Sequence, residues 1–76
     1  MNIEHELQSI CESFQIKIEE TRLYVNESVW YGFKTQEDML IAATELLKVL
    51  NTTFISFKMT LHNEDAHAIE IFEVNL

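Results

Sequence analysis

Apolar side chains recur at helical spacing near the start of the chain. Over residues 2–13 the stripe consists of Ile3, Leu7, Ile10, Cys11 and Phe14. These positions lie on one side of a helix, so the pattern predicts an amphipathic helix with a polar opposite face. Asn2 is a favourable N-cap residue, and Glu4 and Glu6 stand in the first turn, where the helix dipole favours negative charge.

A second helix is predicted over residues 35–51. Thr35 is a good N-cap, and Asp38 follows three residues later in a short form of the capping box. Asn51 can adopt the left-handed conformation that often ends a helix. The expected buried stripe comprises Met39, Ala43, Leu46, Leu47 and Leu50, with Leu40 and Ala42 on its flanks.

The remaining apolar residues alternate with polar ones, which is the pattern of half-buried strands. Four strands are predicted, over residues 14–25, 29–33, 53–62 and 67–75, with hairpin turns at 26–28 and 63–65. In two strands the alternation changes phase. Near residues 19–22 the change predicts a bulge or a turn, and between Ile71 and Phe72, where Val74 and Leu76 follow the parity of Phe72, it predicts a bulge.

The predicted order of elements is α-β-β-α-β-β. Two hairpins in this order favour an antiparallel sheet with the helices packed on one face, so we expect a single two-layer α+β domain over residues 1–76. A domain of this size has a thin stability margin. Self-association, or stabilisation by a partner, is therefore easier to justify than for a larger chain.

Composition narrows the function classes. Thirteen acidic and five basic side chains give a net charge of −8, which argues against direct binding to nucleic acid or to an anionic membrane. The one glycine, Gly32, cannot form a glycine-rich phosphate loop. The one cysteine cannot form an internal disulfide, and the acidic, periodic start is unlike a signal peptide. We therefore expect a reducing, cytoplasmic location, the host cytoplasm if the chain is viral.

No catalytic residues are expected. Cys11 lies on the apolar stripe of the first helix, which favours a packing role over that of a nucleophile. His62 and His67 flank a predicted turn and are the only metal candidates, but their spacing matches no zinc signature, and solvated histidines are the preferred interpretation. Neighbouring carboxylates in turns and helix starts are usually solvated, and nothing resembles a nucleophile elbow. We expect a non-enzyme without cofactors.

Three aromatic residues oppose the core parity of their segments. They are Trp30, Tyr24 and Phe54. If the core parity is assigned correctly, these side chains lie on the outer face or at the sheet edge, and exposed aromatic residues are enriched in binding hot spots. A partner protein or a second copy of the chain would use the same residues.

The acidic side chains supply the second part of the predicted interface. The preferred patch is Glu64, Asp65, Glu70 and Glu73, because no Lys or Arg interrupts that hairpin, and the second choice is Glu19, Glu20 and Glu27. Complementary charge speeds encounter with a basic surface and sets specificity. Solubility alone is the alternative explanation for the acidity.

Two classes of function follow from these features. The first is a non-enzymatic module that occupies a basic, nucleic-acid-binding surface of a partner protein. In its whole profile, short, acidic and without catalytic motifs, the chain resembles phage-encoded inhibitors of bacterial nucleases and defence complexes, anti-CRISPR proteins among them, although no motif carries the likeness. The second class is a structural domain that acts as a homodimer or as a subunit of a larger complex.

Overall fold

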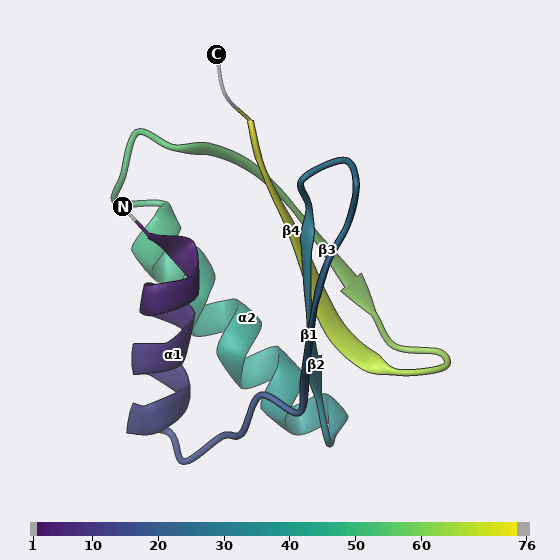
Figure 1. Ribbon diagram of the computed structural model, residues 1–76. Helices are drawn as coiled ribbons and strands as arrows, with labels where there is room; N and C mark the ends of the chain where they lie inside the picture. The colour runs from purple at the N-terminus through teal and green to yellow at the C-terminus, as the bar shows by residue number, and fades with distance from the viewer. Residues whose placement is uncertain (1, 75–76) are drawn as a thin grey trace.

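The computed structural model describes residues 2–74, and its elements follow the predicted order. They are α1 (Ile3–Ser13), β1 (Glu20–Leu23), β2 (Val29–Phe33), α2 (Gln36–Leu50), β3 (Ser56–His62) and β4 (His67–Val74). Both helices lie on the same face of the sheet, and the other face carries no helix (Figure 1). The α+β class with its helices on one face is thus confirmed. Within residues 2–74 neither helix is long and apolar enough to cross a membrane.

The sheet is antiparallel throughout, with the strand order β1-β2-β4-β3. Strands β2 and β4 lie at the centre, and their pairing joins the two hairpins. In this pairing Tyr31 faces Ile69 on the helix side, while Trp30 faces Glu70 on the side without helices. The register therefore decides which residues enter the core.

Both helices begin at the predicted caps. The Asn2 side chain accepts a hydrogen bond from the backbone N–H of His5, and the Thr35 hydroxyl accepts one from the backbone N–H of Asp38, each 3.1 Å long. The predicted left-handed end at Asn51 is wrong, because its φ of −69° is right-handed. The end of α2 is instead completed by threonine: the Thr52 and Thr53 hydroxyls donate to the carbonyls of Val49 and Leu50 at 2.7 and 2.8 Å.

One hydrophobic core lies between the helices and the sheet. Its buried members are Leu7, Ile10, Cys11, Ile16, Tyr31, Phe33, Met39, Ala42, Ala43, Leu46, Leu50, Ile69 and Ile71. The Cys11 thiol is buried as predicted, and desolvation raises its pKa. Because the thiolate is the nucleophilic form, burial and a raised pKa lower the reactivity of Cys11 and support a packing role.

The buried face of α2 differs from the prediction at two positions. Ala42 is fully buried, whereas Leu47 is 37% exposed. At about 100° per residue, Leu47 lies roughly 80° from Met39 and on the solvent side, while Ala42 lies roughly 60° away in the other direction. Phe14, predicted on the α1 stripe, follows the helix as its C-cap and is 49% exposed.

The two predicted phase changes have other causes than bulges. Residues 14–19 form no strand: Gln15 turns the chain with a φ of 57°, Ile16 enters the core, and β1 begins only at Glu20. In β4 the register with β3 continues through Ile71 and Phe72 without a bulge. Apolar residues there occupy both faces of the sheet. β3 also begins three residues later than predicted, and Asn75 and Leu76 lie outside the described residues.

Leu46 and Leu47 provide a matched test of this helix face. Leu46→Ala should lower the free energy of unfolding by about 2–5 kcal/mol, because Leu46 is fully buried. Leu47→Ala should cost about 1 kcal/mol or less, since much of its side chain already contacts solvent. Urea denaturation of both variants measures the difference. Equal losses would contradict the assigned orientation of α2.

Candidate functional site

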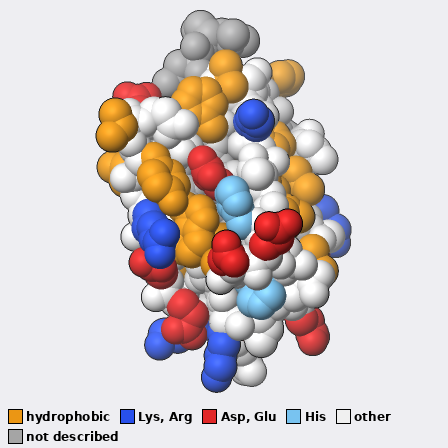
Figure 2. Space-filling view, turned by 90° about the vertical axis from the view of Figure 1, so that its right-hand side faces the viewer, with side chains coloured by type: hydrophobic (Ala, Val, Ile, Leu, Met, Phe, Trp, Pro, Cys, Tyr) orange, Lys and Arg blue, Asp and Glu red, His pale blue; other side chains and the backbone are white. Residues whose placement is uncertain are grey.

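The face of the sheet without helices carries a mixed surface. Figure 2 shows apolar side chains along this face, with histidine and acidic side chains near its middle and basic side chains scattered around them. The paired residues Arg22, Trp30 and Glu70 cross it in one row. In the neighbouring row on the same face, Gly32 of β2 pairs with Ala68 of β4.

Trp30 lies on this face, as its parity predicts, but it is not exposed. Only 8% of it contacts solvent. Its ring lies over Gly32, so closely that a Cβ atom added there would stand 2.7 Å from Cζ3 of the ring. The guanidinium of Arg22 stacks on it at 4.4 Å from the ring centroid and is held by two 2.9 Å hydrogen bonds to Glu20. The exposure predicted for Trp30 is therefore wrong, and its role in binding stays a prediction.

The other two predicted aromatics are exposed. Tyr24 is 39% exposed, and Phe54, in the loop before β3, is fully exposed. The residues on either side of Tyr24 are more exposed still, Leu23 at 76% and Val25 at 104%. The alternating pattern predicts both in a half-buried strand, whereas Leu23 ends the edge strand β1 and Val25 begins the turn. Three consecutive apolar residues directly before Asn26 were the available signal.

The preferred acidic patch does not form one surface. Glu70 points to the side without helices, whereas Glu73, three positions along the same strand, shares the helix side with Ile71. Glu64 and Asp65 lie in the turn between β3 and β4, at the other end of the strand from Glu73. The prediction of a single patch is wrong, because alternation along β4 separates Glu70 from Glu73.

Glu70 is the centre of a hydrogen-bond network. Its carboxylate accepts from the buried Ser28 hydroxyl and bonds Nε2 of His62, both at 2.9 Å. These two hydrogen bonds, that of Ser28 foremost, lower the pKa of Glu70. The residue types are those of a catalytic triad, but the carboxylate stands between serine and histidine. His62 therefore cannot take a proton directly from Ser28 in this arrangement.

His62 and His67 do not converge on a common point. His62 pairs with Ala68 and His67 with Phe33, so the imidazoles belong to opposite faces of the sheet. Nδ1 of His67 is 2.7 Å from Oδ1 of Asn63. Over residues 2–74 no group of three or more His, Cys, Asp or Glu side chains is placed to hold a metal ion.

The second-choice acidic residues are also distributed. Glu20 is engaged by Arg22, whose hydrogen bond lowers the pKa of the Glu20 carboxyl. The Glu19 side chain is exposed, and its backbone N–H donates to the carbonyl of Gly32. Glu27 lies in the turn between β1 and β2, with a φ of 70°, and lines a cleft on the helix side.

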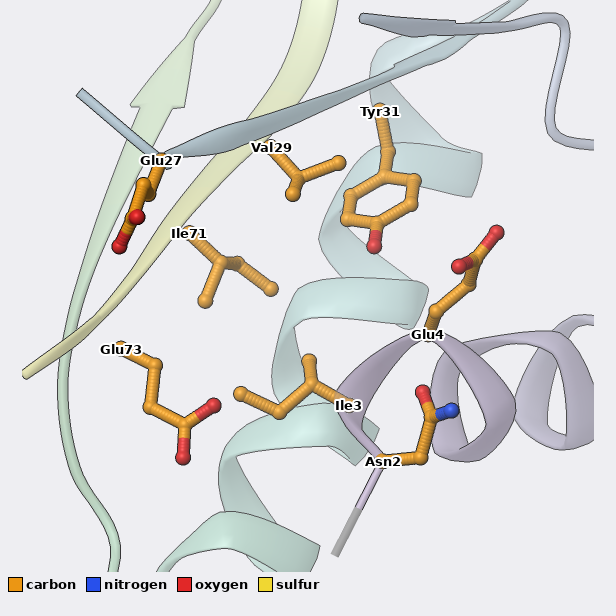
Figure 3. A pocket seen from close by; sticks show the side chains of 8 residues that line it. All are labelled: Asn2, Ile3, Glu4, Glu27, Val29, Tyr31, Ile71 and Glu73. Carbon is orange, nitrogen blue, oxygen red and sulfur yellow. The ribbon is translucent and has the colours of Figure 1, made fainter. Parts of the chain in front are cut away.

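This cleft, termed the acidic cleft below, opens between the start of α1 and the sheet (Figure 3). Its volume is about 380 Å³. Its lining residues are Asn2, Ile3, Glu4, Glu27, Val29, Tyr31, Ile71 and Glu73. Three carboxylates and no basic side chain line it, so its potential is negative.

Tyr31 is the buried polar residue of the acidic cleft. It is 2% exposed, and its hydroxyl points into the space between α1 and the sheet (Figure 3). Burial, and secondarily the charge of Glu4, raises the pKa of Tyr31 to about 12. The phenol is therefore neutral at physiological pH and can both donate and accept a hydrogen bond.

Comparisons with protein-family models, with curated proteins and with solved structures return no match for this chain.

Gly32→Ala tests the packing of Trp30. The added methyl group would meet the ring, so the ring must lift from the sheet, at a cost of about 1–3 kcal/mol in unfolding free energy. The fluorescence of Trp30, the chain's one tryptophan, should shift to the red. In a Trp30→Leu background the same change should be close to neutral. Unchanged emission and stability in Gly32→Ala would contradict the close approach.

Glu70→Gln tests the network around Glu70. The folded-state pKa of Glu70 is lowered, so its carboxylate stabilises the fold above the unfolded pKa of about 4.3 and loses this effect as pH falls through the folded pKa. The variant should lose about 1 kcal/mol at pH 7, and the difference from wild type should shrink below about pH 4. Glu73→Gln, on the same strand, is the control. A difference independent of pH would rule out this origin.

Proposed function

We propose that this chain is a non-enzymatic protein-binding module that docks on a basic surface of a partner protein. The contact would be made by the end of the molecule where the turn between β1 and β2 lies beside the acidic cleft. The observation that carries the proposal is the exposure of three consecutive apolar residues in that hairpin, Leu23, Tyr24 and Val25, in a chain of net charge −8.

Exposed apolar residues at a turn and carboxylates around them have separate roles in association. The apolar residues supply surface that is removed from water on binding. An aromatic residue such as Tyr24 is a frequent hot-spot residue. The carboxylates of Glu27 and Glu73, which line the neighbouring cleft, would steer a basic partner toward this end. Glu27 belongs to both features, because it lies in the turn and lines the cleft.

The exposed apolar residues and the surrounding carboxylates best fit a partner with a basic surface that binds nucleic acid. Such surfaces are rich in Lys and Arg, and an acidic protein that covers one would compete with DNA or RNA. The module would act in the cytoplasm, the host cytoplasm if the chain is viral, and would inhibit its partner by occupation, as anti-defence proteins of phages do. Trp30 and Phe54 would lie outside the primary contact, Trp30 because it is buried and Phe54 because it belongs to the loop before β3.

The experiment uses the intact chain as bait to isolate the partner. DNA or RNA is then added to test whether it displaces the chain from the partner. Glu27→Lys/Glu73→Lys should slow association by about tenfold or more, and added salt should weaken wild-type binding. Val25→Ser should speed dissociation. Glu64→Lys/Asp65→Lys makes the same change of charge at the far end of the strands and should have a smaller effect.

The outcomes separate the parts of the proposal. If Glu64→Lys/Asp65→Lys slows association more than Glu27→Lys/Glu73→Lys does, the contact lies at the opposite end of the sheet. Binding that is indifferent to salt and to both double changes, or an acidic partner, would refute a basic docking surface.

A homodimer or assembly domain is the second candidate function. The observation that favours it is the sheet face without helices, on which the half-buried Phe72 and the ring of Trp30 lie. In that case two copies would pack through these faces, and sedimentation equilibrium would give twice the chain mass at micromolar concentration. A monomer at all concentrations would rule out this candidate.

A further inference from the structure

Strand β3 forms one edge of the sheet and is paired along one side alone. It runs over Ser56–His62 and pairs with β4, while its other side carries no strand among residues 2–74. Neither helix lies against it within this range, because α2 packs on β2 and β4 and α1 packs on α2. The backbone N–H and C=O groups on the outer side of β3 are therefore free to pair with a further strand.

The helix side of β3 continues the apolar surface of the core beyond the helices. Phe57 and Met59 are half-buried and pack against the core, and Leu61 is 45% exposed. Met59 and Leu61 pair with the core residues Ile71 and Ile69, which places this apolar row on the helix side. A strand added beside β3 would cover both the apolar row and the open backbone groups.

The distribution of charge indicates what can occupy this edge. Residues 52–63 contain Lys58 and no Asp or Glu, in a chain whose net charge is −8. The opposite edge strand, β1, begins with Glu20 directly after Glu19. Two copies of the chain repel each other over most of their surface, and the β3 edge is a long stretch along which they can meet without opposing carboxylates.

We propose that β3 pairs antiparallel with β3 of a second copy about a two-fold axis beside Met59, so that two four-stranded sheets become one. Met59 is the midpoint of Ser56–His62, so this register pairs the whole strand with itself. Phe57 then lies opposite Leu61 of the second copy, and each covers apolar surface of the other. A register centred on Lys58 is less favourable, because it sets two ammonium groups opposite each other.

The same register is complementary on the face without helices. Lys58 lies opposite Thr60 of the second copy, and Thr60 pairs within its own chain with Glu70. The Lys58 ammonium thus stands two strands away from a carboxylate of the other copy. Strands in a sheet lie about 4.8 Å apart, so the lysine and glutamate side chains together span this distance across the small Thr60.

Edge pairing goes beyond the docking function proposed above and leaves that surface free. β1 and the turn that follows it lie at the other edge of the sheet from β3, so a dimer would carry two docking ends. Edge pairing also differs from the face-to-face homodimer of the second candidate function, because the face with Trp30 and Phe72 stays open.

The first test is the mass of the intact chain as a function of its concentration. Sedimentation velocity should show a monomer at low and a dimer at high concentration, with a Kd on the order of 10⁻⁴ M, because the pairing of one strand from each copy makes a small interface. Added salt should strengthen the dimer, since it screens the repulsion between two chains of charge −8. Salt should weaken docking on a basic partner, so the two proposals can fail separately.

The second test measures contacts between the copies directly. In an equal mixture of ¹³C-labelled and unlabelled chain, an isotope-filtered NOE experiment should connect the Phe57 ring of one copy with the Leu61 methyl groups of the other. Amide hydrogen exchange in β3 should slow as the concentration rises, while exchange in β1 should not change.

Leu61→Lys and Leu47→Lys are a matched pair of variants. Both change charge equally at a partly exposed leucine, 45% and 37% exposed, but Leu47 lies on the solvent side of α2. Leu61→Lys should weaken dimerisation by about tenfold or more, because an ammonium would be held against Phe57 of the second copy. Leu47→Lys should change it by less than about threefold. Circular dichroism checks that both variants fold, and the NOE contacts of the wild-type chain decide if Leu61→Lys does not.

Three results would overturn the proposal. They are a chain that stays monomeric up to about 1 mM, ten times the expected Kd, equal weakening of the dimer by the two folded variants, and NOE contacts that join Trp30 or Phe72 of the two copies. The last result would assign the dimer to the sheet face without helices.

Discussion

The pairing of β2 with β4 is the interaction on which the rest of the structure depends. It joins two helix–hairpin halves that otherwise contact each other only through the helices and the core. Its register places Tyr31 and Ile69 beneath the helices and Trp30 and Glu70 on the other side. A shift by one residue would exchange these sets, exposing the core and burying Glu70. The cleft, the network and the packed indole all follow from this one alignment.

Local signals predicted the elements well. The side chains of Asn2 and Thr35 cap their helices as their residue types suggest, because capping involves atoms only three residues apart. Alternation likewise identified β2 and β4 and assigned Trp30 to the correct face. These properties depend on short stretches of chain and are therefore present in the sequence pattern.

The errors concern properties that depend on residues far apart in sequence. Parity placed Trp30 on the face without helices but could not show that Gly32 and Arg22 would bury it there. The apolar Phe72 indicated a bulge because the pattern cannot distinguish a change of register from apolar residues on both faces. The cleft was missed for the same reason, since Glu4, Tyr31 and Glu73 are brought together only by the packing of α1 on the sheet.

The place of Asn2 and Glu73 in the cleft has a practical consequence. Asn2 lines the acidic cleft, and β4 runs past Glu73 toward the same end of the molecule (Figure 1). An affinity tag or a fluorescent protein attached close to Asn2 or Glu73 would stand beside the cleft and crowd it. The turn at residues 63–66 lies at the opposite end and offers a better anchoring point. A cysteine introduced at Glu64 would be the one accessible thiol for surface immobilisation, because Cys11 is sealed in the core.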